Sequence, residues 1–285
     1  MANISTRQAY KQCQKIARSH YENFPVASWL LPFKLRKPVA AVYAFARSAD
    51  DIADEGDASA EQRLQQLDDM RQAIKLSADG MPPDDPVYVA LADAMSRFDL
   101  PLQLFYDLLD AFSQDVEKKR YADFGEVMNY CRLSANPIGR LILHLAGKTE
   151  RQYLGFSDAT CSALQLINFY QDLSQDYTEM GRIYLPLDEM AAAYVSEDHF
   201  RLKRTDGPML MLMRKQFKRA NQLINAGAPL GKQLGGRLGF ELRLISAGGS
   251  RIIQKLYREN EDLFSRPRLN FMDWAWMFWK ALRAK

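Results

Sequence analysis

The chain has 285 residues, a formal net charge of +3 and a 47% share of hydrophobic residues, which is ordinary for a globular protein with a sizeable core. The charge is mild and no long basic run alternates with aromatic residues, so a nucleic-acid surface is excluded. Three widely separated cysteines without a Cys-x-x-Cys pair predict neither a disulfide framework nor a zinc site.

The N-terminal segment, residues 1–20, is polar and mixes charged with small residues. It lacks the apolar stretch of a secretory signal, and no run of about 18 apolar residues follows that could span a membrane. We therefore expect a cytoplasmic protein.

Helical periodicity recurs along nearly the whole chain, and no alternating strand pattern or Asn-Gly hairpin occurs. The breaks are short and the composition changes little, which predicts an all-α fold with one domain over residues 1–285. The expected breaks lie at Pro25, Pro32, Pro38, 79–86, Pro101, 181–186, 205–208 and 227–236.

The first acid cluster lies in "YAFARSADDIADEGD", residues 43–57. Asp50 and Asp54 share one helical face at a spacing of four, and Arg47 precedes Asp50 and Asp51 by one turn. Like charges on one face are destabilising, strongly so if desolvated, unless a cation compensates them. The pattern predicts a positive partner there.

The second acid cluster consists of Gln165, Asn168, Asp172 and Asp176, which we expect on one continuous helix that contains "NFYQDLSQDY". Apolar side chains surround it, so we expect an inward-facing row of oxygen donors of the kind that builds a site within a helical bundle. A lone acidic motif is common on exposed helices. Two copies, one of them in an apolar context, favour function over a solvated surface.

The donors of both clusters are carboxylate and amide oxygens, without His or Cys nearby, which selects a hard cation such as Mg²⁺. Magnesium bridges one or two carboxylates to substrate phosphate oxygens, so a phosphorylated or diphosphate substrate is expected. No glycine-rich phosphate loop and no Gly-x-Ser-x-Gly motif occurs, which disfavours nucleotide binding and acyl chemistry.

The C-terminal segment, residues 271–285, combines aromatic and methionine side chains with Lys280, Arg283 and Lys285. Such a composition is typical of helices that lie in a membrane interface, so peripheral membrane contact is one hypothesis. The other is a terminal helix that docks its aromatic side chains on the core.

With these motifs in view, the chain resembles the squalene/phytoene synthase family from about residue 8 to about residue 270. The family's pattern of Tyr, Arg and paired Asp is matched by Tyr43, Arg47, Asp50, Asp51 and Asp54, and its second pattern by the second acid cluster. The segment "YCRLSANPIG", residues 130–139, also resembles the family. Within the family, three segments look most like the hydroxysqualene synthase branch of hopanoid biosynthesis, namely residues 20–32, "ARSADDIADEGD" and "YCRLSANPIGRLIL".

The resemblance implies an all-α isoprenoid synthase bundle with a central cavity and two or three Mg²⁺ ions. The implied reaction is loss of diphosphate from presqualene diphosphate, rearrangement of the cation and capture by water, without a nicotinamide cofactor. Relatives that make phytoene often carry Arg and Glu where this chain has Gln171 and Gln175. That departure weakens the match to the carotenoid branch.

The resemblance also assigns roles to individual residues. Catalysis is expected from Tyr130, Tyr43 and Arg47, although Arg47 pairing only with Asp51 is an open alternative. The expected metal ligands are Asp50, Asp54, Asn168, Asp172 and Asp176, and the expected substrate-binding residues are His20, Tyr21, Glu22, Asn23, Phe24, Tyr43, Arg47, Gln165 and Asn168. Arg182 and Tyr184 match the family too, but helix termination explains Arg182 equally well.

Two other functions are open at this point. One is head-to-head condensation of two farnesyl diphosphates to presqualene diphosphate or squalene, which uses the same acidic residues. The other is a non-catalytic assembly factor on the same fold, in which the acid clusters are expected to erode. For the enzyme, the partners expected are an isoprenoid diphosphate, the inner face of the membrane and other enzymes of the squalene pathway that take over intermediates.

Overall fold

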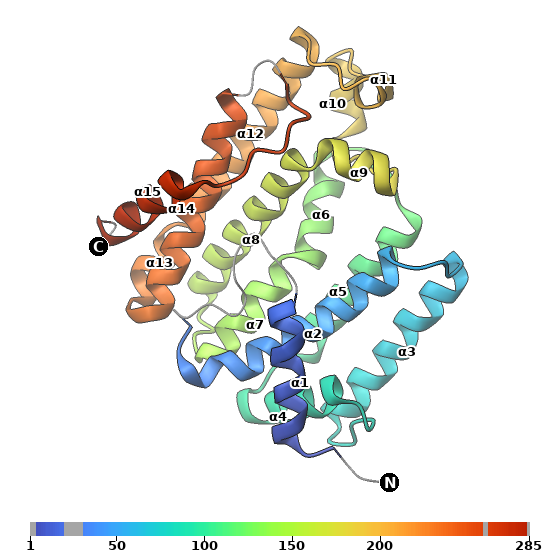
Figure 1. Ribbon diagram of the computed structural model, residues 1–285, viewed down its shortest axis with the longest axis vertical. Helices are drawn as coiled ribbons and strands as arrows, with labels where there is room; N and C mark the ends of the chain where they lie inside the picture. The colour runs from blue at the N-terminus through green and yellow to red at the C-terminus, as the bar shows by residue number, and fades with distance from the viewer. Residues whose placement is uncertain (1–3, 20–30, 259–261, 284–285) are drawn as a thin grey trace. The chain divides into compact units, whose positions relative to one another are not determined.

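The computed structural model describes residues 4–19, 31–258 and 262–283 (Figure 1). These residues form fifteen α-helices, and the one β feature within the described ranges is an isolated bridge between Tyr121 and Pro186. The all-α prediction is confirmed. The predicted substrate residues His20 to Phe24 lie outside the described residues.

The chain divides into two compact units. Unit 1 comprises Met1–Glu117 and Pro137–Leu154, and unit 2 comprises Lys118–Asn136 and Gly155–Lys285. The single domain with a central cavity stays a prediction.

Unit 1 is organised around α2, which packs against four neighbouring helices. Small buried residues such as Ala40, Ala41 and Ala44 let these neighbours approach closely, and Phe45 meets Phe105 of α5 edge to face at 5.3 Å. The helices of unit 1 are α1 (Thr6–Ser19), α2 (Phe33–Asp54), α3 (Ala60–Ala78), α4 (Pro86–Phe98), α5 (Leu102–Glu117) and, after its first residue, α7 (Asn136–Ala146).

The break expected at Pro38 is wrong, because Pro38 lies inside α2 and is buried. Proline lacks an N–H and so removes one helical hydrogen bond, here to the carbonyl of Lys34 in the first turns of the helix. Burial of Leu35, Pro38 and Val39 on one face offsets that loss. Pro32 does mark a boundary, since it is the N-cap of α2.

Unit 2 is built on long helices, with α14 packed against α12, α13 and α15. Gly249 allows α14 to approach Leu164 and Ile167 closely, because a Cβ at this position would lie 3.0 Å from Leu164 Cδ2 and 3.3 Å from Ile167 Cδ1. The helices are α6 (Phe124–Ser134), α8 (Arg151–Gln171, in unit 2 from Gly155), α9 (Leu173–Met180), α10 (Leu187–Ala192), α11 (Glu197–Arg201), α12 (Gly207–Gly227), α13 (Pro229–Leu234), α14 (Gly236–Arg258) and α15 (Phe271–Arg283).

The remaining breaks that fall on described residues separate helices as expected, with one addition. The segment 227–236 contains the short helix α13, which begins at Pro229. Proline is favoured in the first turn of a helix, and Gly235, with φ of 59°, follows its last residue. No described helix is long and apolar enough to cross a bilayer.

Candidate active site

The first acid cluster lies at the C-terminal end of α2 in unit 1, and Arg47 holds it together. The Arg47 guanidinium is 3.1 Å from Asp50 Oδ2 and 2.5 Å from Glu55 Oε1, and it also pairs with Asp51. Arg47 therefore makes the pair with Asp51 that was the alternative to a diphosphate role, and it makes two more. The positive partner expected from the sequence is present.

Negative charge is still in excess at Asp50. Burial and the neighbouring Asp54 raise the pKa of Asp50 to about 6, although Arg47 acts in the opposite direction. Tyr43 lies one turn before Arg47 on α2 and is half-buried. A carboxylate whose proton affinity is raised by a like charge is a favourable place for a second cation.

A further acid, Asp115, was missed by the sequence interpretation. It is buried on α5 and adds to the negative charge that raises the pKa of Asp50. The signal was available, because Asp115 continues the buried face of Leu104, Leu108 and Ala111 at helical spacing. An acid on an apolar face is therefore a sequence signal for a site shared with Asp50.

The second acid cluster lies in unit 2 at the junction of α8 and α9. A single continuous helix through this cluster was expected, and that is wrong at Asp172, which is the N-cap of α9 with φ of −103° and ψ of 17°. The four-residue hydrogen-bond spacing of a helix is nevertheless kept, because Asp172 N donates to Asn168 O at 2.9 Å and Asp176 N donates to Asp172 O at 2.8 Å. Asp172 is buried, whereas Gln165, Asn168 and Asp176 are half-buried.

Asp172 is paired with Arg266, a residue that the sequence interpretation did not single out. Arg266 Nη2 donates to Asp172 Oδ2 at 3.0 Å, and Arg266 Nε is 2.5 Å from Asp172 Oδ1. Burial raises the pKa of Asp172, and Arg266 opposes that shift. The two residues are 94 positions apart, so no local pattern could have indicated the pair.

Arg266 belongs to the strap, which we define as residues 262–270 between α14 and α15. Gln171 is buried beside Asp172 and donates from Nε2 to the carbonyl of Pro267 at 2.8 Å. At the start of the strap, Leu263 N donates to Thr205 Oγ1 at 3.1 Å. Gln171, which departs from the pattern of carotenoid-forming relatives, thus fixes the strap next to Arg266.

An aromatic cluster adjoins the second acid cluster in unit 2 and consists of Tyr121, Tyr130, Phe169 and Tyr184. Phe169, next to Asn168 in the chain, stacks on Tyr184 with ring centroids 3.7 Å apart and planes 4° from parallel. Tyr130 is buried, 5.9 Å from Phe169 and 5.6 Å from Tyr184. Tyr184 therefore lies beside Tyr130 in the candidate site, although the sequence analysis did not include it among the expected catalytic residues.

The donor chemistry of both clusters fits magnesium, because every candidate ligand is an oxygen. Among the described residues, no three His, Cys, Asp or Glu side chains already lie in an arrangement that could hold a metal ion. At the two clusters, Arg47 and Arg266 pair with carboxylates of the predicted ligand set. The cluster in unit 1 offers carboxylate oxygens and the cluster in unit 2 offers carboxylate and amide oxygens, each a partial set of the kind that Mg²⁺ completes with water and phosphate.

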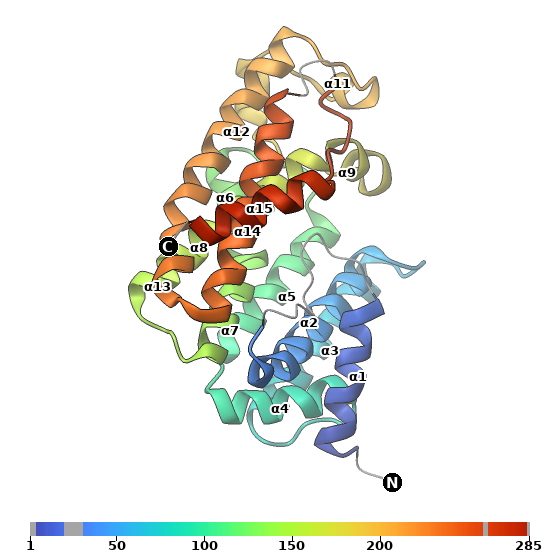
Figure 2. The ribbon, with the colours of Figure 1, turned by 60° about the vertical axis from the view of Figure 1, so that its left-hand side comes forward.

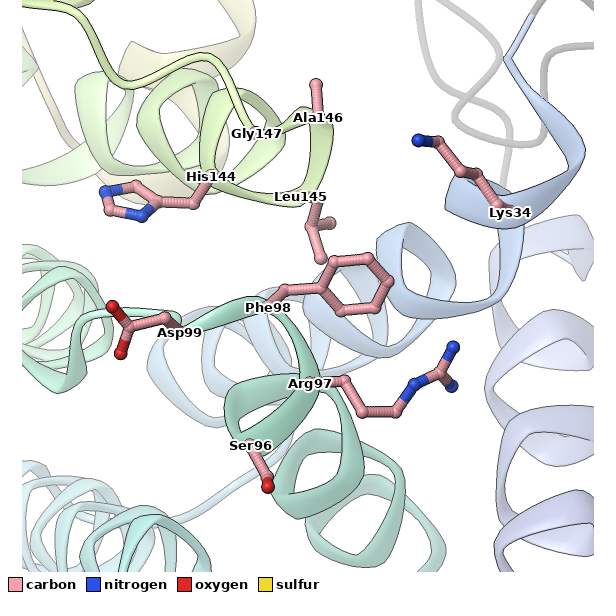
Figure 3. A pocket seen from close by; sticks show the side chains of 9 residues that line it. All are labelled: Lys34, Ser96, Arg97, Phe98, Asp99, His144, Leu145, Ala146 and Gly147. Atoms are coloured by element: carbon pink, nitrogen blue, oxygen red, sulfur yellow. The ribbon is translucent and has the colours of Figure 1, made fainter.

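A separate pocket of about 390 Å³ lies within unit 1 (Figure 3). Figure 3 shows Phe98 and Leu145 between the basic side chains of Lys34 and Arg97 on one side and His144 on the other. Among the predicted site residues that the structure describes, none lines this pocket. The pKa of His144 is lowered by burial, so its imidazole favours the neutral form.

Comparison with known proteins decides the family. The squalene/phytoene synthase family model matches residues 17–274. The chain belongs to the squalene/phytoene synthase family. The resemblance to this family that the sequence motifs indicated is thereby confirmed.

Within the squalene/phytoene synthase family, the chain is similar to hydroxysqualene synthases and to a solved squalene synthase. The chain is 36% identical to the hydroxysqualene synthase of Rhodopseudomonas palustris over 236 residues, which cover 82% of this chain and 79% of the relative. It is 34% identical to the hydroxysqualene synthase of Sinorhizobium fredii over the same length and shares. The crystal structure of squalene synthase HpnC from Alicyclobacillus acidocaldarius matches with a TM-score of 0.84 and 32% identity, covering 90% of this chain and 96% of that one.

Proposed function

We propose that this protein is a hydroxysqualene synthase. It would ionise presqualene diphosphate, allow the cyclopropylcarbinyl cation to rearrange, and release hydroxysqualene after capture by water. The observation that carries the proposal is the similarity to hydroxysqualene synthases over four-fifths of the chain. The donor chemistry of both acid clusters supports it, since diphosphate is a leaving group that hard cations stabilise.

We propose Asp50, Asp54, Asn168, Asp172 and Asp176 as the residues that hold two or three Mg²⁺ ions. When bound, the ions supply positive charge against the departing diphosphate. The raised pKa of Asp50 and the burial of Asp172 support this role, because both carboxylates are in surroundings where added positive charge is favourable.

Arg47 and the N-terminal residues His20 to Asn23 would bind the diphosphate itself. Arg47 presents a planar fork of N–H donors that suits phosphate oxygens, and its three carboxylate partners restrict where that fork can point. His20 to Asn23 and Gln165 complete the proposed contacts to the substrate. Their assignment rests on the family pattern.

Aromatic side chains would shield the carbocation. Tyr130 is buried in the aromatic cluster, whose rings would present π faces worth about 1 to 2 kcal/mol to a desolvated cation. Tyr43 and Phe24 are proposed to face the isoprenoid chain. The Tyr130 hydroxyl would position water or donate a hydrogen bond to the departing diphosphate.

The surroundings of the reaction form a further part of the proposal. A thirty-carbon substrate partitions into bilayers, so we propose that the protein is cytoplasmic and works at the inner face of a membrane. Intermediates would pass to and from other enzymes of the squalene pathway. The apolar and aromatic composition of the C-terminal segment supports a peripheral contact.

Turnover of single substrates tests the reaction. Purified protein with Mg²⁺ is incubated separately with presqualene diphosphate and with farnesyl diphosphate, and products are identified by mass spectrometry. Hydroxysqualene from presqualene diphosphate, and no product from farnesyl diphosphate, is the expected result. Turnover of farnesyl diphosphate alone would overturn the proposal in favour of head-to-head condensation.

A binding measurement distinguishes an enzyme from an assembly factor. A ligand that binds only the folded state stabilises it by RT ln(1 + [L]/Kd), about 2.7 kcal/mol at a hundredfold excess over Kd. A non-hydrolysable diphosphate analogue should therefore raise the melting temperature only when Mg²⁺ is present. The absence of any shift would favour the scaffold function.

A further inference from the structure

Helix α15 packs against α14 (Figure 2), and the buried residues of α15 lie along one side of it. Asp273, Met277 and Ala281 follow one another at a spacing of four, and all three are buried. Asp273 Oδ1 is 2.6 Å from Arg251 Nε, and Asp273 Oδ2 is 2.7 Å from Lys255 Nζ. The acid of this helix is thus neutralised on its inward side, and the orientation of the helix about its own axis is set.

The opposite side of α15 leaves large apolar side chains in contact with solvent. Phe271, Phe278 and Leu282 recur at spacings of seven and four, which places them on one line, and they are 84%, 51% and 50% exposed. Phe278 also meets Phe240 of α14 edge to face at 5.2 Å. We call this surface the α15 face; it consists of Phe271, Met272, Trp274, Phe278, Trp279 and Leu282.

Charge is distributed unequally around the same helix. Asp273 is its only acid, so the α15 face carries no negative charge. Lys280 and Arg283 lie on one flank, where Lys280 Nζ is 4.7 Å from the Trp276 ring centre and the Arg283 guanidinium carbon is 3.8 Å from that of Trp279. Cations stacked on indole rings beside an apolar surface match the headgroup layer of an anionic membrane.

We propose that the α15 face binds the surface of an anionic lipid bilayer, with its aromatic side chains among the acyl chains and Lys280 and Arg283 at the headgroups. Thirteen residues extend about 20 Å, too short to cross a hydrocarbon layer of about 30 Å, so the helix lies in the plane of the interface. The inference deepens the membrane contact of the proposed function by naming the surface and the lipid charge.

Tryptophan fluorescence gives a direct test, because three of the four tryptophans of the chain lie in α15. A Trp29→Phe background leaves only Trp274, Trp276 and Trp279 to report. Vesicles of phosphatidylcholine with about a third phosphatidylglycerol should shift their emission to the blue, and acyl-brominated lipids should quench it. Emission that is the same with and without these vesicles would overturn the proposal.

Variants separate the apolar from the charged contribution. Phe278→Ser with Trp279→Ser should weaken binding to the anionic vesicles roughly tenfold or more. Lys280→Ala with Arg283→Ala should weaken binding to anionic vesicles by a similar factor and leave binding to pure phosphatidylcholine unchanged. Met211→Ser and the pair Lys218→Ala, Lys232→Ala, exposed on other helices of unit 2, are the matched controls and should bind as the wild type does.

Two outcomes would redirect the inference. Sedimentation that shows a dimer lost on Phe278→Ser, with no vesicle binding, would assign the face to a second copy of the chain. Equal weakening by the controls would show general electrostatic adhesion. Vesicle binding is measured without substrate, and turnover is measured in detergent. A failure to bind vesicles therefore does not bear on the proposed reaction, which the turnover experiment tests independently.

Discussion

In both acid clusters an arginine neutralises carboxylates, but the arginine comes from a different part of the chain in each. In unit 1, Arg47 neutralises acids three, four and eight residues further along the same stretch of chain. In unit 2, the cation for Asp172 comes from Arg266 in the strap, 94 residues away. The first cluster is therefore assembled as soon as α2 forms, whereas the second depends on the completed tertiary structure.

The largest expected effect comes from Asp172→Asn. The substitution keeps the side-chain volume and removes one proposed metal ligand, so turnover should fall on the order of 10³-fold. Circular dichroism should still show the helical fold. Asp198→Asn, which changes an exposed acid of the same unit, serves as control, and near-normal turnover by Asp172→Asn would contradict the proposed ligand role.

Removing each arginine in turn compares the clusters directly. Breaking a fully buried ion pair costs about 3 to 5 kcal/mol. Arg266 is about a third exposed, so we expect a loss of about 2 kcal/mol in unfolding free energy for Arg266→Ala.

The acids around Arg47 are more exposed, so Arg47→Ala should cost about 1 kcal/mol. Chemical denaturation measures both losses. Arg201→Ala, whose pair with Asp198 is exposed, should change stability by less than about 0.5 kcal/mol. If Arg47→Ala proves more damaging than Arg266→Ala, the contrast between a local and a long-range cluster is wrong.

Asp273 extends the comparison to a second long-range pair of unit 2. Its backbone and side-chain hydrogen bonds and its cationic partners outweigh burial and lower its pKa to about 2 in the folded state. A depressed carboxyl pKa stabilises the fold above the unfolded pKa of about 3.9, and this contribution is lost as the pH falls toward 2. Wild type should exceed Asp273→Asn by about 2 kcal/mol at pH 6, and the gap should close between pH 4 and pH 2.

Substitution of Asp50 should have a small effect on stability, opposite in sign to that of Asp273. Its folded pKa of about 6 exceeds the unfolded value, so the folded state binds more protons and metal-free stability falls as the pH rises from about 4 to 6. The side chain is 43% exposed, which limits the effect to about 1 kcal/mol after screening. Asp50→Asn should therefore be slightly more stable than wild type at pH 7.5 without metal, while Asp57→Asn, at an exposed acid, should be unchanged.

Sequence interpretation succeeded where the information is local. The helical class, most of the breaks and the spacing of the two clusters follow from periodicity, proline and glycine, and all of these act within a few residues. It failed at Pro38, where burial outweighs a lost hydrogen bond, and at Asp172, where two helices meet inside one periodic pattern. Asp115 lay within reach of the same reasoning and was overlooked.

The sequence by itself determined the oxygen-donor character of the candidate ligands and the arginine beside the first acid cluster, because both are encoded in residue types at helical spacing. Its motifs also carried the resemblance that led to the family. Only the tertiary structure decided that Arg266 pairs with Asp172, that Gln171 fixes the strap, and that Tyr184 joins Tyr130 and Phe169. It also decided which side of α15 remains exposed. These contacts join segments far apart in the chain, and their formation depends on how whole helices pack, which no local pattern encodes.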